Sequence, residues 1–252
     1  MLDGKVVVVT GASRGIGKGL AIGLADLGAQ VVCAARTEQA SQHDLPGTIH
    51  DTVAEIQRSG GTALAVRCDI GEPTDIKHLI ATTFKEFGRI DGLVNNAMSE
   101  TRASFEESTI EQWDDCMRIN VRSLYLLCQE VVPVMSEQDG GGIVNISSGG
   151  AAHESTPFMP PGYVVYSVAK AALERFTTAV APELQPYGVV INALRPGAVK
   201  TERATHELGP DFDFSGWTTP ERVVAPVADL LTASFTGKIL DVSGHGKDWP
   251  AR

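Results

Sequence analysis

Four consecutive valines, Val6–Val9, lead directly into a glycine-rich turn, Thr10–Gly17, with the sequence TGASRGIG. A short run of β-branched residues predicts a buried strand. The glycines predict a sharp bend at Gly11 and, at Gly15 and Gly17, a backbone that no β-carbon keeps away from a ligand. A helix beginning near Gly15 would direct its free amides and positive dipole end at that ligand. This order predicts a cradle for the pyrophosphate of a dinucleotide; the alternative is a glycine-rich turn that binds nothing.

The end of the second predicted strand, Gln30–Arg36, indicates which dinucleotide fits. A carboxylate there would accept hydrogen bonds from the ribose 2′-hydroxyl of NAD and would repel a 2′-phosphate. Ala35 occupies the expected acidic position, and Arg36 follows it. Arg14, within the glycine turn, is a second cation that can reach the same place. We therefore predict NADP (NADPH) in preference to NAD; the alternative is that both arginines are solvated surface charges.

Tyr166 and Lys170 form a Y-x-x-x-K pair in a segment, Tyr166–Gln185, whose apolar spacing predicts a helix. Residues four apart lie on one helix face. A free phenol with a pKa near ~10 is a poor acid at neutral pH. The charge of Lys170, joined by that of an oxidised nicotinamide, would lower the pKa of Tyr166 toward the working range. The pair fits the proton donor of a carbonyl reduction, although the pattern alone often arises by chance.

Three further polar features would complete such a site. The apolar strand Gly142–Ser148 ends in two hydroxyls that can hold a carbonyl oxygen beside the tyrosine. Asn95–Ala97 ends another apolar strand and suits the floor of the cofactor site. Asn120 falls within a predicted helix, Ile110–Met135, where a buried amide must be hydrogen-bonded. We expect a polar network that includes Lys170 and water.

In this order, the motifs resemble those of the short-chain dehydrogenase/reductase family, and the resemblance runs from Leu2 to about Gly244. It implies a single doubly wound α/β domain of the Rossmann type. The matching features are TGASRGIG at 10–17, Asp69 after the third strand, NNA at 95–97, Asn120, IVNISS at 143–148, YSVAK at 166–170, and Asn192 followed by RPG at 195–197.

The resemblance also implies roles, position by position, for four catalytic residues. Tyr166 would be the general acid/base, and Lys170 would lower its pKa and bind the nicotinamide ribose. Ser148 would orient the substrate carbonyl, and Asn120 would support a water-linked proton relay.

A larger set would bind the cofactor. Asp69 would contact adenine, Asn96 would line the site, and Pro196–Gly197 with Thr201 would embrace the nicotinamide carboxamide. The full expected set is Gly11, Ser13, Arg14, Gly15, Ile16, Gly17, Arg36, Asp69, Ile70, Asn96, Ala97, Tyr166, Lys170, Pro196, Gly197, Val199 and Thr201.

The chain departs from the family pattern near the expected substrate site. Ser148 and Tyr166 are 18 positions apart, more than is usual, and the extra residues lie within the proline-rich stretch 151–161. This insertion leaves open whether Ser147 shares the role of Ser148. Tyr163 is nearer to the serines, but it has no lysine four residues later.

Two other departures concern loops. Met98 replaces the glycine usual after NNA and would narrow the pocket floor. The linker Thr37–Thr48 is long, and its LPGTI sequence at 45–49 is similar to the hydroxysteroid dehydrogenase-like branch; it is a surface loop or a flap over the adenosine end. We expect substrate loops at about 149–165 and 198–218, the second carrying aromatic residues that favour an apolar substrate.

Composition sets the remaining bounds. A chain of 252 residues with 43% hydrophobic content suits one α/β domain spanning 1–252. Strands alternate with helical stretches, which predicts a parallel sheet of about seven strands with helices on both faces. No apolar run reaches the roughly 18 residues of a membrane span, and Met1–Asp3 leaves no room for a signal peptide.

Charge and cysteines exclude other classes. The net charge of −10 argues against nucleic-acid binding. The four cysteines (33, 68, 116 and 128) have no C-x-x-C pairing and predict buried thiols in a reducing cytoplasm. The histidines lack metal-site spacing, so we expect no metal.

We therefore expect an oxidoreductase that transfers a hydride between NADPH and a small ketone or aldehyde, or an alcohol in reverse. The alternatives are a non-catalytic dinucleotide-binding module, and an epimerase or dehydratase that retains its cofactor. The resemblance further implies a homodimer or homotetramer that pairs through Ile110–Met135 and Tyr163–Tyr187. Trp249 is expected to be exposed, where it either reaches a neighbouring subunit or belongs to a frayed tail.

Overall fold

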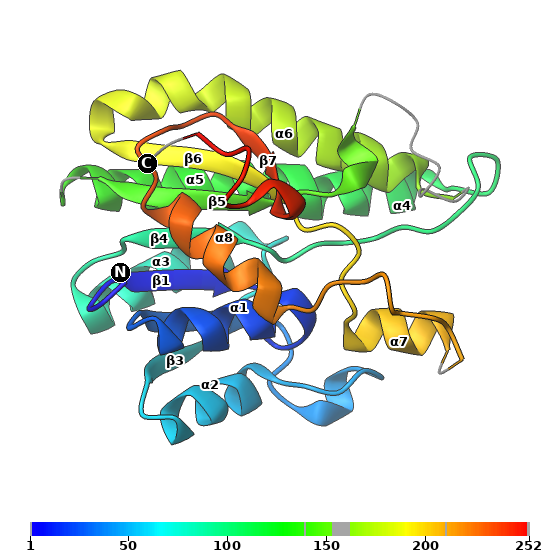
Figure 1. The fold of residues 1–252 in the computed structure, drawn as a ribbon, viewed down its shortest axis with the longest axis horizontal. Coiled ribbons are helices and arrows are strands. Elements are labelled where there is room, and N and C mark those ends of the chain that lie inside the picture. Colours follow the sequence, from blue (N-terminus) through cyan, green and yellow to red (C-terminus); the bar gives the residue numbers. More distant parts are fainter. Residues whose placement is uncertain (1, 139, 153–161, 210, 251–252) are drawn as a thin grey trace.

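The computed structural model describes residues 2–138, 140–152, 162–209 and 211–250. One parallel sheet runs through it in the order β3-β2-β1-β4-β5-β6-β7 (Figure 1). The predicted α/β fold with about seven parallel strands is confirmed. The strands are β1 (Val6–Thr10), β2 (Gln30–Ala35), β3 (Thr62–Arg67), β4 (Gly92–Asn95), β5 (Gly141–Ile146), β6 (Val189–Arg195) and β7 (Ile239–Asp241).

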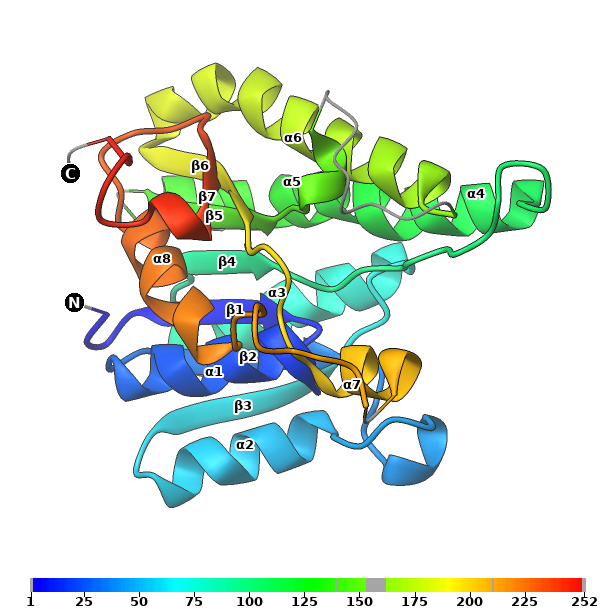
Figure 2. The ribbon, with the colours of Figure 1, turned by 45° about the vertical axis from the view of Figure 1, so that its right-hand side comes forward.

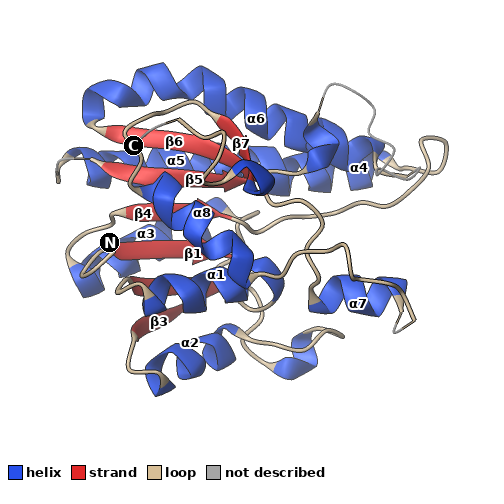
Figure 3. Cartoon of the chain, viewed as in Figure 1, coloured by secondary structure: helices blue, strands red, loops and turns tan. Residues whose placement is uncertain are grey.

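Helices cover both faces of the sheet (Figures 2 and 3). One face carries α1 (Gly15–Asp26), α2 (Ile49–Arg58) and α8 (Glu221–Leu231). The other carries α3 (Pro73–Phe87), α5 (Ser123–Ser136) and α6 (Val164–Leu184). Within the described part of the chain, no helix has the length and apolar character needed to cross a membrane. The shorter helices are α4 (Ile110–Met117), α7 (Glu202–Leu208) and single turns at Ala40–Gln42, Gly149–Ala151, Gln185–Tyr187 and Val242–Gly244.

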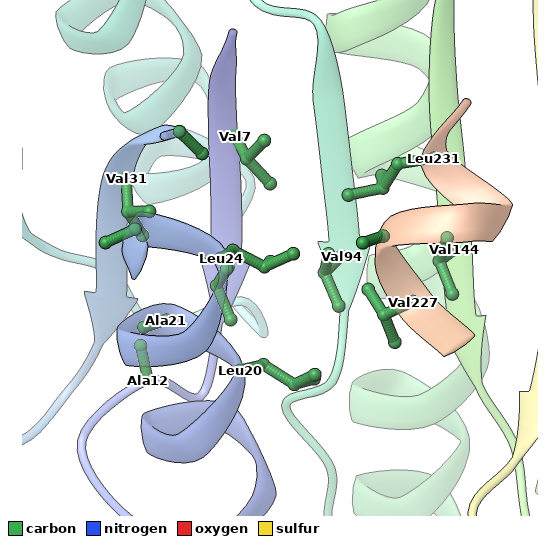
Figure 4. Close-up of a cluster of buried hydrophobic side chains, with 14 of the residues drawn as sticks. Val7, Ala12, Leu20, Ala21, Leu24, Val31, Val94, Val144, Val227 and Leu231 are labelled. Atoms are coloured by element: carbon green, nitrogen blue, oxygen red, sulfur yellow. The ribbon is translucent and has the colours of Figure 1, made fainter. Parts of the chain in front are cut away.

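The core consists mainly of two apolar clusters, one on each side of the sheet. Both faces of the central strands are covered, so these strands are apolar at almost every position, as β1 is. Figure 4 shows the cluster beneath α1 and α8, in which strand side chains meet the apolar stripe of each helix. Its labelled members include Val7, Leu20, Leu24, Val31, Val94, Val144, Val227 and Leu231.

The winding of the sheet reverses between β1 and β4, which are neighbours although β2 and β3 separate them in sequence. In open α/β sheets, ligands bind at the carboxyl ends of the strands beside such a reversal. Thr10 and Asn95 end these two strands, and Asn95 pairs in register with Asn145 of β5. The motifs at 10–17, 95–97 and 143–148 therefore meet at one edge.

The predicted helix Ile110–Met135 is continuous but not regular. A π-helical turn, Arg118–Arg122, joins α4 to α5. Such a turn adds a residue to the helix and is frequent at functional sites. Asn120 lies in this turn, where it is buried.

The expectation of an exposed Trp249 is wrong. Its indole is half-buried and packs against the cluster beneath α1 and α8. The ring lies edge-on to His245, with centroids 4.8 Å apart, and Nε1 donates to the carbonyl oxygen of Asp241 at 3.0 Å. The tail therefore folds back on its own chain.

Candidate active site

A cavity of about 760 Å³ opens at the carboxyl edge of the sheet, within the size range of ligand-binding pockets. The glycine turn, the ends of β2 to β6, the start of α6 and helix α7 form its walls. Ser148, Tyr166 and Lys170 line it together with the whole expected cofactor-binding set, whereas Asn120 lies outside it. The remaining members of that set are Gly11, Ser13, Arg14, Gly15, Ile16, Gly17, Arg36, Asp69, Ile70, Asn96, Ala97, Pro196, Gly197, Val199 and Thr201.

The glycine turn has the bend that its residues predict. Gly11 and Gly15 have φ angles of +69° and +57°, a region that L side chains seldom adopt. Gly17 is also needed for the packing of the turn itself. A β-carbon at Gly17 would lie 2.2 Å from the carbonyl oxygen of Gly11. This glycine lets α1 begin close against the turn and so maintains the shape of the cradle.

The first amide of α1 is bound to an anionic side chain. Gly15 N donates to Oε2 of Glu202 at 2.9 Å. Glu202 begins α7, whose N-cap Thr201 accepts a hydrogen bond from Ala204 N at 3.2 Å. The free amides and dipole that stabilise a carboxylate here would stabilise a phosphate in the same way. The turn therefore fits the pyrophosphate of a dinucleotide.

Arg14 connects the loop at 37–48 to the glycine turn. Its guanidinium donates to the carbonyl oxygens of Pro46 at 3.0 Å and Gly47 at 2.9 Å. A β-carbon at Gly47 would lie 2.4 Å from the carbonyl oxygen of Ser13, so the loop passes close to the turn. Arg14 is thus engaged with the backbone of the loop.

Arg36 is differently placed. Its side chain is 66% exposed and forms a long ion pair with Asp69, at 3.9 Å. Such an exposed pair contributes little to stability, so the guanidinium is available to a ligand. His43, from the loop at 37–48, also lines the cavity. Burial, together with the charges of Arg14, Arg203 and Arg36, lowers the pKa of His43. This end of the cavity is therefore rich in positive charge.

Tyr166 is buried, and its surroundings act on its pKa in opposite directions. Burial raises the pKa of the phenol, the charge of Glu100 raises it further, and a hydrogen bond with Ser148 lowers it. The Nζ of Lys170 lies 5.6 Å from the Tyr166 ring centroid and donates to the carbonyl oxygen of Ile146 at 2.7 Å. Burial lowers the pKa of Lys170 to about 8. The protein's own groups thus raise the pKa of Tyr166, chiefly through desolvation. The predicted lowering also invokes the charge of an oxidised nicotinamide and stays a prediction.

The two serines after β5 have different partners. The Ser147 hydroxyl donates to Glu174 at 2.7 Å, and both side chains are buried. Arg195 binds both oxygens of the same carboxylate at 2.7 Å. Both serines line the cavity, but it is Ser148 that hydrogen-bonds to Tyr166. The hydroxyl of Ser147 is therefore committed to a buried ion pair.

Asn120 lies behind the cavity wall. Its Nδ2 donates to the carbonyl oxygens of Ser99 at 2.7 Å and Cys116 at 2.9 Å. Within the described residues, the buried Oδ1 atoms of Asn120 and Asn95 have no hydrogen-bond partner. Both asparagines and Lys170 border a second cavity of about 10 Å³, close to the space that one water needs. These groups fit the predicted network of Lys170, Asn120 and water.

An ion-pair cluster that the sequence does not predict lies at the substrate end of the cavity. Glu100 pairs with Arg102 at 2.9 Å and with Arg203 of α7 at 3.5 Å. Arg102 also pairs with Glu207 of α7 at 2.8 Å and lies over the ring of Tyr163, 5.1 Å from its centroid. Its position in the sequence gives one clue, because Glu100 follows NNA at the sheet edge where ligands bind.

The expected substrate loops are partly described. Met98 lines the cavity, as its place after NNA predicts. Phe212, Phe214 and Trp217 of the 198–218 loop form one aromatic cluster, with centroids 4.9–5.7 Å apart. Residues 153–161, most of the insertion at 151–161, lie outside the described residues.

Comparison with known proteins gives consistent matches. The family model for short chain dehydrogenases matches residues 5–209. A 3-oxoacyl-[acyl-carrier-protein] reductase of Synechocystis sp. is 34% identical, over 96% of this chain and 97% of its own. A short-chain type dehydrogenase/reductase from Mycobacterium marinum has a TM-score of 0.83 at 29% identity, covering 98% and 97%. A Beutenbergia cavernae protein, named an NAD(P)-dependent gluconate 5-dehydrogenase and containing NADP at low occupancy, has a TM-score of 0.82 at 30% identity, covering 96% of each chain.

Proposed function

The chain belongs to the short-chain dehydrogenase family, and from this membership we propose an NADP-dependent oxidoreductase that interconverts a small ketone or aldehyde and its alcohol. One observation carries the proposal: Ser148, Tyr166 and Lys170 line the same cavity as the glycine turn. A bound nicotinamide would supply the hydride, or accept it in reverse. The protein must then hold the substrate oxygen and exchange a proton with it.

Tyr166 is the group that exchanges this proton. In carbonyl reduction its hydroxyl donates to the substrate oxygen, which accepts a second hydrogen bond from Ser148. The raised pKa of Tyr166 keeps the phenol protonated at neutral pH but makes it a weak acid, so proton donation requires the charges of Lys170 and of a bound oxidised nicotinamide to lower that pKa. Oxidation of the alcohol requires the phenolate, which a cation at Lys170 stabilises.

Lys170 also takes part in a proton relay, because the proton lost by Tyr166 must be replaced. The small cavity beside Lys170 and Asn120 is close to the size of one water, and the unpartnered Oδ1 of Asn120 gives that water an acceptor. We assign Asn120 to holding a proton-carrying water there.

The preference for NADP rests on Arg36. The side chain of Arg36 is exposed beside Asp69 at the end of β2, where a 2′-phosphate would lie. A charge-assisted hydrogen bond contributes about 1.5–3 kcal/mol. Arg14 acts on the cofactor indirectly, since its guanidinium orders the loop at 37–48.

Exposed apolar side chains and buried thiols support a proposal for assembly and location. Tyr125 of α5 and Val164 and Val168 of α6 are large apolar side chains left 41–48% exposed. Pairing of these helices between subunits would cover them, and we propose a homodimer or homotetramer.

All four cysteines are free and buried, which suits the reducing cytoplasm.

The test is NADPH consumption with a panel of ketones and aldehydes, measured for the wild type and for Tyr166→Phe. We expect the variant to lose at least about 10²-fold in turnover while it still binds NADPH by fluorescence. NADPH binding with no reduction of any carbonyl would favour the binding-module alternative. A cofactor that co-purifies and is not consumed would favour an epimerase or dehydratase.

A further inference from the structure

Glu100 is a carboxylate that is nearly buried in the cavity wall, where an unpaired charge is unfavourable. It lines the cavity, and its side chain is only 9% exposed. An ionised carboxylate is stable in such a place only when it is paired. Nε and Nη2 of Arg102 both lie 2.9 Å from its Oε1, and Arg203 lies 3.5 Å from its Oε2. These arginines pair with the carboxylate of Glu100 at the substrate end of the cavity.

The carboxylate also has capacity for a further donor. A carboxylate offers about four acceptor positions. Oε1 receives both bonds from Arg102, whereas the Arg203 contact to Oε2 is too long for a strong hydrogen bond. The Tyr163 hydroxyl supplies one further hydrogen bond. Counted over the described residues, these partners leave at least one acceptor position.

Glu100 acts on the reacting end of the cavity. Its charge raises the pKa of both Tyr166 and Lys170, in each case as a smaller effect than burial. Tyr163, whose hydroxyl is hydrogen-bonded to Glu100, places its ring edge-on to the ring of Tyr166, with the centroids 6.2 Å apart. Glu100, Tyr163 and Tyr166 are therefore in successive contact along one wall.

The segment 198–218 presents apolar side chains to the same cavity. Leu208, Phe212 and Trp217 line the same cavity and offer apolar surface. A substrate held between Glu100 and these apolar side chains would be apolar on one side and would offer a hydrogen-bond donor to Glu100 on the other.

We propose that Glu100 is a specificity-determining residue, which selects carbonyl substrates that carry a hydroxyl or ammonium group beside the carbonyl carbon. This inference rests on the proposed function, because it names the substrate class of the same site. The substrates would be α-hydroxy or α-amino ketones with an apolar remainder, and in reverse the matching diols or amino alcohols. A carboxylate beside the carbonyl offers no hydrogen-bond donor to Glu100 and would be disfavoured.

A matched set of ketones tests this proposal. Four compounds share one apolar chain and carry hydroxymethyl, aminomethyl, methyl or carboxylate beside the carbonyl. We expect wild-type kcat/KM with NADPH to favour the first two over the methyl ketone by about ten- to a hundredfold, as a hydrogen bond to a charged group allows. The hydroxyl and amine compounds show which donor is preferred.

The variant is Glu100→Gln, which keeps the size of the side chain and removes its charge. It should lose most of the preference for donors and should accept the carboxylate compound better. Glu207→Gln is the matched control, because it removes the other carboxylate bound to Arg102 and should keep the preference. Glu100→Asp, which keeps the charge, should keep part of it.

Binding separates this inference from the proposed function. Calorimetry of the same ketones with NADPH-loaded Tyr166→Phe, with and without Glu100→Gln, requires no turnover. A donor preference that depends on Glu100 supports the inference even if no ketone is reduced. If the wild type reduces all four ketones equally, or if Glu100→Gln and Glu100→Asp slow all four equally, the inference is overturned and the reductase stands.

Discussion

The amide of Gly15 and the carboxylate of Glu202 are joined by a hydrogen bond of 2.9 Å, so the first residue of α7 is bound to the first residue of α1. The carboxylate lies where the pyrophosphate of a dinucleotide would accept a hydrogen bond from the same amide. Two anions cannot share this donor without repulsion. Cofactor binding must therefore displace the side chain of Glu202 from Gly15.

This contact predicts that Glu202→Gln binds NADPH more tightly than the wild type, by about three- to tenfold, because one negative charge leaves the phosphate site. Fluorescence titration measures the affinity. Glu207→Gln on the same helix, with its carboxylate on Arg102, controls for the loss of one charge from α7. Unchanged or weaker binding in Glu202→Gln would contradict competition at Gly15.

Substitutions of Arg36 and Arg14 are predicted to affect cofactor binding differently. Arg36→Ala should weaken NADPH binding about ten- to a hundredfold and leave NADH binding unchanged, because it removes a partner of the 2′-phosphate. Arg14→Ala should weaken both cofactors, because it releases the loop at 37–48 from the glycine turn. Titration of each variant with both cofactors decides this. If NADPH affinity survives in Arg36→Ala, the basis for NADP preference is wrong.

The buried Lys170 predicts a dependence of stability on pH. Burial lowers the pKa of Lys170 to about 8 in the folded protein, whereas a free lysine titrates near ~10.4. Between these values the unfolded chain holds a proton that the folded protein has lost, so the free energy of unfolding rises with pH. The unfolding free energy of the wild type minus that of Lys170→Met should rise by about 1–3 kcal/mol between about pH 7.5 and 10.

Urea unfolding at several pH values measures this difference. Lys85→Met, at an exposed position of α3, controls for the loss of a lysine. A difference that stays level or falls across this range would mean that Lys170 keeps its proton in the folded protein.

The elements that the sequence predicts well are those with a periodic or motif signal. The buried valines of β1, the glycine turn and the helix carrying Tyr166 and Lys170 each have a local pattern that fixes both type and place. Because carboxyl ends of parallel strands meet at one edge, local patterns also brought the expected cofactor residues into one cavity. The family membership predicted from the same motifs is confirmed.

The features that sequence analysis missed depend on contacts between loops. Glu100 has no periodicity around it, and its partner Arg203 is about a hundred positions away in the sequence. The exposure of Trp249 was misjudged because its hydrogen-bond partner is a backbone carbonyl, which has no sequence signature. The raised pKa of Tyr166 depends on desolvation and on the nearby charge of Glu100, and only the packed environment determines both.

The hydrogen bond between Gly15 and Glu202 has a consequence for how the protein is made. Its two residues are 187 positions apart, and the chain leaves the ribosome at about 5–20 residues per second. The cradle therefore emerges many seconds before the helix that contacts it. Because a domain generally folds as a unit, the glycine turn gains its neighbouring strands and its contact with Glu202 only when most of the chain is present, so this hydrogen bond reports that synthesis of the sheet is nearly complete.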